Sequence, residues 1–261
     1  MRILLTNDDG IYAPGLDALH AELQRLGTVD VVAPALEQSG VSHSITYLEP
    51  LLVKEIFREG TLFGRAVAGS PADCVRMAML EFCRPAPDLV VSGINSGANA
   101  GINVLYSGTV AAAIEGAFYG VTAIAVSLSE NRHPNYRLAA RHAVQVIEQL
   151  VSHVPAGSLW NVNVPETRPD WPLGVKTLPM SLERYREVVE RRIDPRGRSY
   201  YWIGTDPAGG HVIEPGTDVE GLNEGYITIS PLYFDLNHRR LLSEFRDHHW
   251  TLNTEPDDGG P

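Results

Sequence analysis

Two adjacent carboxylates near the start of the chain are the first residues whose type and spacing suggest chemistry. Asp8 and Asp9 directly follow Ile3 to Thr6, a short apolar run typical of a buried strand. Like charges this close repel each other and need a counter-charge. Only two of the chain's 21 basic residues are lysines, so a bound cation is the simplest counter-charge. The alternative is that Asn7 to Gly10 serves only as a turn that leads into a helix.

Two further polar loops are expected to lie beside this one. Residues 37–42 follow the predicted strand Val29 to Ala33, and residues 95–99 follow the predicted strand Asp88 to Ser92. In an open parallel sheet, ligands bind beyond the carboxyl ends of the strands, where such loops meet. Their carboxylate, hydroxyl and amide oxygens suit Mg²⁺, Mn²⁺ or Ca²⁺ better than zinc, which prefers His or Cys.

The start of an alanine-rich helix, predicted over Gly108 to Tyr119, offers a second kind of site. Ser107 is a good N-cap, which alone explains its position. The same geometry presents free N–H groups and the positive end of the helix dipole to an anion, and Gly108 permits close approach. We favour a phosphate-binding role for this helix start.

Three other features have adequate structural explanations. Gly69 to Asp73 begins a helix with the pattern of a capping box, although this loop is also a candidate for lining the site. His43 lies near the second polar loop, and we interpret it as a packed or surface histidine rather than a catalytic one. His248 and His249 have no matching third ligand and are interpreted as structural or exposed.

Alternating strand and helix patterns indicate an α/β fold, a Rossmann-like and mainly parallel sheet with helices on both faces. Residues 1–165 form this core with the site. Residues 166–252 are expected to complete the same domain as an appended β-rich region with a protruding arm, and 253–261 to be a disordered tail. The charged stretch Glu183 to Arg198 is either a solvated loop or that arm.

Composition narrows the functional classes. The 261 residues carry a formal net charge of -11 and are 44% hydrophobic, which is ordinary for a globular protein. The acidity argues against a nucleic-acid polymer as partner. No apolar run reaches the roughly 18–20 residues of a membrane span, and the N-terminus turns acidic too early for a signal peptide. Cys74 and Cys83 are expected on opposite helix faces as free thiols, which favours the cytoplasm.

Several enzyme classes lack their sequence motifs here. The chain has no G-x-x-x-x-G-K-[ST] segment, no G-x-G-x-x-G after the first strand and no G-x-S-x-G nucleophile elbow. A phosphatase with an aspartyl nucleophile usually shows D-x-D after the first strand, whereas Asp8 and Asp9 are adjacent.

Several long motifs, in this order, resemble the SurE (survival protein E) family of 5'/3'-nucleotidases. They are RILLTNDDGIYAPG from Arg2, VVAPALEQSGVSHSIT from Val31, GSPADCV from Gly69, PDLVVSGINSGANAG from Pro87, YSGTVAAAIEG from Tyr106, NVNVP from Asn161 and GTDVEGLNEGYITISPL from Gly216. Ser70 replaces a frequent threonine and Ala111 a frequent glycine, and the tail from about Leu252 has no counterpart.

The resemblance implies a divalent-metal-dependent phosphatase that acts on nucleoside 5'- and 3'-monophosphates, with one Mg²⁺ or Mn²⁺ per subunit, or Ca²⁺ in a crystal. The implied metal ligands are Asp8, Asp9, Ser39 and Asn95, and the implied phosphate-binding residues are Asn95, Ser107, Gly108 and Thr109. Family members form dimers or tetramers by exchanging C-terminal segments, and Tyr185 to Tyr201 is the candidate arm. Some members also degrade short polyphosphate.

Our mechanistic hypothesis is attack by a water, metal-bound or activated by Asp8 or Asp9, on a metal-polarised phosphate, with the helix start at Ser107 stabilising the phosphoryl oxygens. One rival makes Asp8 a covalent nucleophile. Another is a nucleotide-binding module without catalytic activity. A metal-dependent amide or ester hydrolase is disfavoured by the phosphate-type helix starts.

Overall fold

One mixed β-sheet forms the body of the protein, which was obtained as a computed structural model that describes residues 1–129, 133–184, 187–205 and 213–252. Within these residues the sheet has nine strands in the order β3-β4-β2-β1-β5-β6-β7-β11-β8. Their bounds are β1 (Arg2–Thr6), β2 (Thr28–Pro34), β3 (Val53–Arg58), β4 (Thr61–Val67), β5 (Leu89–Ser96), β6 (Thr122–Leu128), β7 (Leu159–Val164), β8 (Val175–Thr177) and β11 (Ile227–Leu232).

The central strands of the sheet are parallel, and each side of the sheet also has an antiparallel strand. From β4 to β7 all neighbours run parallel, while β3 and β11 are antiparallel to their inner neighbours. The central strands are buried on both faces, which explains their nearly continuous apolar sequences. Glu59 and Gly60 both have positive φ and make the tight turn between β3 and β4.

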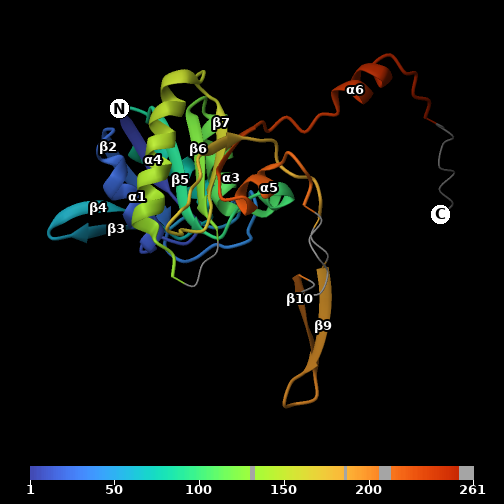
Figure 1. The fold of residues 1–261 in the computed structure, drawn as a ribbon, viewed down its shortest axis with the longest axis horizontal. Coiled ribbons are helices and arrows are strands. Elements are labelled where there is room, and N and C mark those ends of the chain that lie inside the picture. Colours follow the sequence, from blue (N-terminus) through green and yellow to red (C-terminus); the bar gives the residue numbers. More distant parts are fainter. Residues whose placement is uncertain (130–132, 185–186, 206–212, 253–261) are drawn as a thin grey trace, which may run out of the picture.

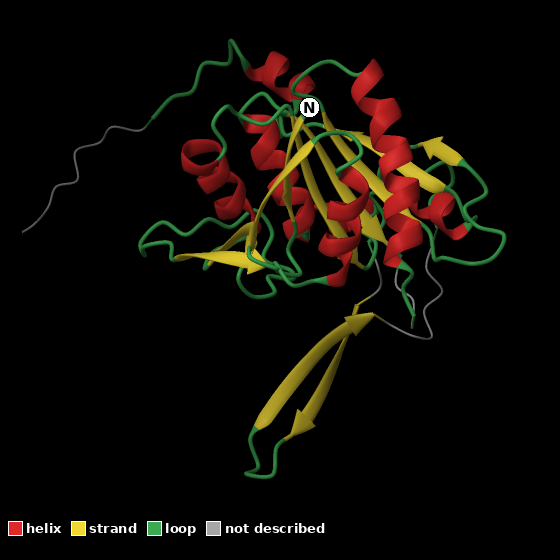
Figure 2. Cartoon of the chain, turned by 90° about the vertical axis from the view of Figure 1, so that its left-hand side faces the viewer, coloured by secondary structure: helices red, strands yellow, loops and turns green. Residues whose placement is uncertain are grey.

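Helices cover both faces of the sheet (Figures 1 and 2). The helices are α1 (Pro14–Leu23), α2 (Pro71–Met77) with a π-helical turn (Ala78–Phe82), a 3₁₀ helix (Gly101–Tyr106), α3 (Gly108–Phe118), α4 (Tyr136–His153), α5 (Asp218–Asn223) and α6 (Arg239–Phe245). Residues alternate along β1, so that Ile3 and Leu5 pack beneath α1 and α4, whereas Leu4 packs beneath α2 and α3. The predicted three-layer α/β architecture is confirmed.

The end of β5 has a different structure from the one that we predicted from the sequence. We predicted a strand that ends at Ser92 and a polar loop that holds residues 95–99, but β5 continues to Ser96 and a 3₁₀ helix starts at Gly101. The strand resumes after a register shift, with Asn95 opposite Ser127. Gly93 has a φ of 140°, and a Cβ there would lie 2.2 Å from the carbonyl oxygen of Val126. A glycine-rich sequence is typical of a loop. Here the glycine instead permits an irregular strand.

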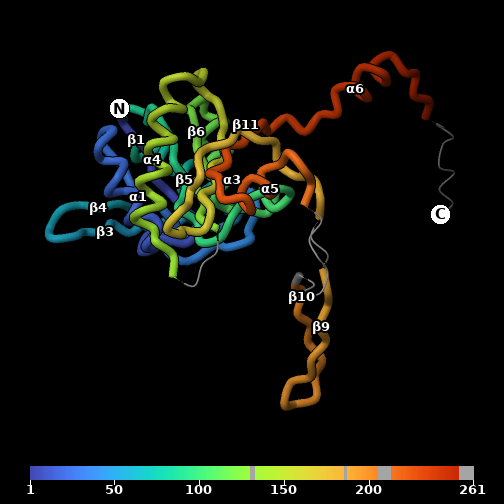
Figure 3. The backbone as a smooth tube through the Cα atoms, viewed as in Figure 1, coloured from blue at the N-terminus to red at the C-terminus, as the bar shows by residue number. Residues whose placement is uncertain are grey.

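The C-terminal third contributes strands to the main sheet and two projections. β9 (Glu187–Ile193) and β10 (Ser199–Thr205) form an antiparallel hairpin that extends away from the body (Figure 1). The described part of the charged stretch, residues 183–198, therefore belongs to an arm. Residues 185–186 lie outside the described ranges. After β11 the chain runs outward to α6, a helix that the sequence did not predict (Figure 3). The predicted disordered tail, 253–261, also lies outside the described residues.

Three simpler expectations can be compared with the structure directly. Cys74 and Cys83 are both buried and free, as expected. Among the described helices, none combines the length and the apolar character needed to cross a membrane. His248 and His249 are exposed, in agreement with the sequence interpretation.

Candidate active site

In the acidic loop after β1, the residues that form the turn are not the residues that carry the carboxylates. Asn7 makes the turn, since its amide donates to the carbonyl of Gly10 (2.9 Å) and accepts from the Gly10 amide (3.2 Å). Gly10 has a φ of 98°, which favours glycine. Because Asn7 closes the turn, the side chains of Asp8 and Asp9 are not needed for it. The turn interpretation is therefore confirmed for Asn7 and Gly10, and it leaves the role of the two carboxylates open to the cation hypothesis.

Asp8 lies against the first turn of α3. The Thr109 hydroxyl donates to Asp8 Oδ1 at 2.5 Å, and both this hydroxyl and the Thr109 backbone lower the pKa of the carboxylate. A Cβ on Gly108 would lie 2.9 Å from Asp8 Cβ and 3.1 Å from its Oδ2. Only glycine lets the helix start approach this closely. The first loop and the start of α3 are therefore in direct contact.

The other two polar loops reach the same place. The amide of Gln38 donates to the Asp8 carbonyl (2.8 Å), which lays the second loop beside the first. The amide of Ser96 donates to Asp9 Oδ2 (3.2 Å), which does the same for the end of β5. Asn95 donates its Nδ2 to the Gly97 carbonyl (2.7 Å), so its amide would meet a ligand through oxygen.

Ser39 follows Gln38 and donates its hydroxyl to Glu37 Oε1 at 2.7 Å. Glu37 was not among the predicted site residues, yet its charge raises the pKa values of both Asp8 and Asp9. Glu37 therefore adds a third negative charge near the two aspartates.

Burial dominates the electrostatics of this cluster. It raises the pKa of Asp8 above its ordinary value, against the Thr109 hydrogen bonds that lower it. Burial, with the Asp8 charge second, raises the pKa of Asp9 to about 6. No basic side chain among the described residues contributes to either shift. The site therefore concentrates negative charge that its own side chains do not neutralise.

The donor chemistry of this cluster fits a hard divalent cation. Two carboxylates, a hydroxyl and an amide oxygen come from three loops that the hydrogen bonds above bring together. In the described part of the chain no group of three or more His, Cys, Asp or Glu side chains could hold a metal ion. The fit thus rests on a mixed oxygen set rather than on a histidine or cysteine cluster.

The start of α3 has the geometry of a capped helix. Ser107 is extended (φ -78°, ψ 126°), and its Oγ accepts from the amide of Val110 at 3.1 Å. The N-cap interpretation is confirmed, and the Thr109 hydroxyl already donates to Asp8. The first anion that this helix start stabilises is therefore the buried carboxylate of Asp8.

A buried polar layer behind α3 was missed by sequence reasoning. Asn99 donates to the hydroxyl of Ser127 (2.8 Å) and to that of Thr109 (3.4 Å). Asn161 and Asn163 both donate to the carbonyl of Asn99 (2.7 and 3.2 Å). These two asparagines alternate along an otherwise apolar strand and so face one side of the sheet. Alternating amides in a buried strand are the signal that could have located this support.

The helix start at residues 69–73 is a full capping box, as predicted. The Ser70 hydroxyl accepts from the Asp73 amide (3.1 Å), and the Asp73 carboxylate accepts from the Ser70 amide (3.1 Å). Asp73 also accepts from the Thr46 amide (2.9 Å). The structural interpretation is therefore sufficient, and the box additionally holds the segment after Ser39. His43 contacts Glu115 rather than the acidic cluster.

Comparisons with known proteins agree on one family. The family model described as "Survival protein SurE" matches residues 3–187. The chain is 53% identical over 258 residues to the 5'-nucleotidase SurE of Rhodopirellula baltica, covering 97% of this chain and 99% of that protein. It is 44% identical to the 5'-nucleotidase SurE of Syntrophobacter fumaroxidans, covering 93% and 97%.

The fold comparison gives the same result. The crystal structure of the SurE protein from Aquifex aeolicus superposes with a TM-score of 0.82 at 36% identity, covering 94% of this chain and 98% of that one. With matching motifs, matching fold and near-complete coverage, this chain belongs to the SurE (survival protein) family.

Proposed function

We propose that this protein is a divalent-metal-dependent phosphatase that converts nucleoside 5'-monophosphates, and 3'-monophosphates, to nucleoside and phosphate. One structural observation supports it above all. The Asp8 carboxylate, in a cluster suited to a cation, touches the first turn of α3, a helix start suited to a phosphate. Relatives named 5'-nucleotidase SurE support the choice of substrate.

In this proposal Asp8, Asp9, Ser39 and Asn95 hold one cation, Mg²⁺ or Mn²⁺. When bound, the cation supplies Lewis-acid polarisation of the phosphate. The amide oxygen of Asn95 and the Ser39 hydroxyl are neutral ligands, so the carboxylates provide the charge. Glu37, hydrogen-bonded to Ser39, orients that hydroxyl.

The phosphate of the substrate lies at the start of α3 in this arrangement. Ser107 and the Gly108 amide donate to its oxygens and stabilise the charge that develops there. Thr109 contributes mainly by holding Asp8, the contact observed in the structure. A water attacks phosphorus, the bond from phosphorus to the ribose oxygen breaks, and that oxygen takes up a proton from solvent.

We assign Asp9 to accept the proton of the attacking water. Asp8 is buried and already accepts from Thr109, whereas Asp9 is less buried and accepts from the Ser96 amide. The rival mechanism makes Asp8 a covalent nucleophile. Rapid quenching with labelled substrate separates the two, because only the rival accumulates an acyl-phosphate on the protein.

A panel of nucleoside monophosphates, assayed with Mg²⁺, with Mn²⁺ and after chelation, tests the function. We expect phosphate release that needs the added metal. Release unaffected by EDTA contradicts the metal site, and binding without any release supports the rival nucleotide-binding module. Tripolyphosphate in the same panel tests for an exopolyphosphatase side activity.

We also propose that the arm and the C-terminal segment contact further copies of this chain, giving a homodimer or homotetramer. Large apolar side chains are exposed on both projections, including Trp202 and Ile203 on β10 and Leu242 and Phe245 on α6. Light scattering on Trp202→Ser should show a smaller assembly. Leu80→Ser, at an exposed apolar residue of the body, is the control. The cytoplasm remains the expected compartment because both thiols are free.

A further inference from the structure

The segment that carries Ser39 has no regular secondary structure. Residues 35–52 connect β2 to β3 and contact α2 at Asp73 and α3 at Glu115. A loop of this length is usually functional, and its conformation depends on a few discrete contacts. The position of Ser39 therefore depends on what fixes residues 36–46, here called the Ser39 loop.

The first part of the Ser39 loop is tied by hydrogen bonds to backbone groups. Gln38 donates to the Asp8 carbonyl (2.8 Å). Ser42, in the left-handed region at a φ of 55°, donates its amide to the carbonyl of Tyr106 (3.1 Å) and its hydroxyl to that of Leu105 (2.7 Å). Ser39 lies between these two attachments. Whether Ser42 keeps its hydrogen bonds depends on how the residues after it are held.

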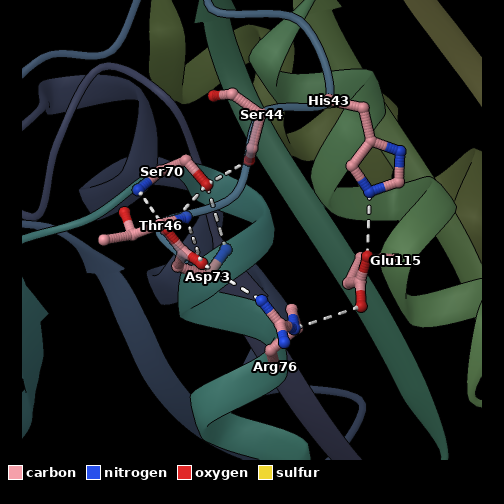
Figure 4. Close-up of polar contacts among 7 residues, drawn as sticks. All are labelled: His43, Ser44, Thr46, Ser70, Asp73, Arg76 and Glu115. Atoms are coloured by element: carbon pink, nitrogen blue, oxygen red, sulfur yellow. Dashed lines mark hydrogen bonds and ion pairs between the residues drawn. The ribbon is translucent and has the colours of Figure 1, made fainter. Parts of the chain in front are cut away.

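The next residue, His43, is attached to α3 by its side chain. His43 Nε2 lies 2.8 Å from Glu115 Oε2, and Glu115 is only 8% exposed (Figure 4). The imidazole ring stacks on Phe118 with centroids 5.5 Å apart, and Phe118 in turn meets Phe234 edge-on at 4.7 Å. The helix that holds Asp8 with its first turn thus holds the Ser39 loop further along.

Glu115 also belongs to a polar chain that crosses to α2 (Figure 4). Its Oε1 lies 3.9 Å from Arg76 Nε, and Arg76 Nη1 lies 3.5 Å from Asp73 Oδ1. Asp73 accepts from the Thr46 amide, which returns the chain to the Ser39 loop three residues after His43. The loop is therefore clamped at both His43 and Thr46 to one connected set of side chains.

From this arrangement we propose that His43 and Glu115 are positioning residues, whose contact holds the Ser39 loop so that the Ser39 hydroxyl faces Asp8 and Asp9. The inference rests on the proposed metal site. Neither residue touches the acidic cluster in the described contacts, so their effect on it passes through the loop. Breaking the contact should loosen the loop and weaken cation binding, with the chemistry itself intact once a cation is bound.

The variants His43→Ala and Glu115→Ala, with their double variant, test this. Glu115→Gln keeps an oxygen that can accept from the imidazole and is the conservative rescue. His153→Ala and Glu148→Ala, at exposed positions of α4 on the opposite face of the sheet, are the matched controls. Circular dichroism and melting temperature show whether each variant is folded, and His43→Ala changes only a partly exposed side chain.

Three measurements are needed. Hydrogen exchange of peptides that cover residues 36–46, without added metal, reports on the loop alone. Electron paramagnetic resonance of added Mn²⁺ gives the binding constant directly. Phosphate release from AMP at limiting and at saturating Mn²⁺ separates weaker metal binding from damaged chemistry.

We expect faster exchange in the Ser39 loop and about tenfold weaker Mn²⁺ binding in both single variants, the size of one lost hydrogen bond to a charged group. The double variant should lose less than the two single losses added together, because both single variants already remove the shared His43–Glu115 contact. AMP hydrolysis should fall at limiting Mn²⁺ and recover at saturation, and Glu115→Gln should behave nearly as the unchanged protein.

Unchanged exchange in the variants overturns the clamp itself. Faster exchange with unchanged Mn²⁺ binding overturns the positioning role. A loss of AMP hydrolysis that saturating Mn²⁺ does not restore also overturns the positioning role. If the unchanged protein neither binds Mn²⁺ nor hydrolyses AMP, the proposed function fails and this inference with it, while hydrogen exchange still reports separately on the clamp.

Discussion

The hydroxyl of Thr109 donates to the carboxylate of Asp8 across 2.5 Å, joining residues that lie 101 positions apart in the chain. This contact connects the end of β1 to the first turn of α3. It satisfies a carboxylate that is 4% exposed, and it ties the candidate cation site to the candidate phosphate site. Two predictions concern this junction directly.

Thr109→Val should lower phosphate release about 10- to 100-fold and destabilise the protein by about 1–3 kcal/mol. Valine keeps the shape of threonine but leaves the buried Asp8 carboxylate without its hydroxyl donor. Steady-state kinetics with AMP and urea unfolding measure the two effects. Thr109→Ser retains the hydroxyl and should lose little, and equal losses in both variants would contradict the role of this hydrogen bond.

Gly108→Ala should abolish most activity, because the new methyl group would lie 2.9 Å from Asp8 Cβ and push the carboxylate from its place. Gly108 does not need a positive φ, so helix formation itself tolerates alanine. Gly204→Ala is the matched control, since nothing lies within 4 Å of a Cβ there. Activity of Gly108→Ala at the level of that control would show that the close approach is unimportant.

Asp9→Asn should abolish activity while the protein still folds. It should also remove the increase in melting temperature that Mn²⁺ gives the unchanged protein, because a ligand that binds only the folded state stabilises it. Calorimetry with and without Mn²⁺, beside the AMP assay, measures both. Full phosphatase activity in this variant would rule out the proposed metal site.

The same residue predicts a pH dependence in the metal-free protein. The pKa of Asp9 is raised from 3.8 to about 6, so the folded state binds this proton more tightly than the unfolded chain does. The stability from this group is therefore present below pH 3.8 and is lost as the pH rises through about 6. Urea unfolding in EDTA should show the unchanged protein losing stability relative to Asp9→Asn over that range. A constant difference would contradict the shift.

The two thiols should be inert in the folded protein. Burial raises the pKa of Cys83 to about 11 and raises that of Cys74 as well, so neither forms the reactive thiolate near neutral pH. An Ellman assay at pH 8 should report almost no thiol in the native protein and both thiols in denaturant. Rapid labelling of the native protein would point to local opening around α2.

The sequence determined the sheet and the identity of the chemistry-bearing loops because these depend on local patterns. Buried parallel strands are short apolar runs, and the residues that follow them must lie at one edge of the sheet. Asp8, Ser39 and Asn95 were located in this way, with the family motifs assigning them as ligands. The N-cap at Ser107 and the capping box at Ser70 also depend on neighbouring residues in the sequence, so both were predicted from it.

Only the tertiary structure decided which partners these residues have. Nothing in the spacing of Asp8 and Thr109 indicates their hydrogen bond, and nothing near His43 in the sequence points to Glu115. The buried amides of Asn161 and Asn163 appeared in the sequence analysis only as part of a family motif. Contacts between distant segments depend on how helices and strands pack, whereas local patterns fix only which segments are helices and strands. The sequence therefore supplied the candidate ligands, and the packing of α3 and the Ser39 loop around β1 decided how they are held.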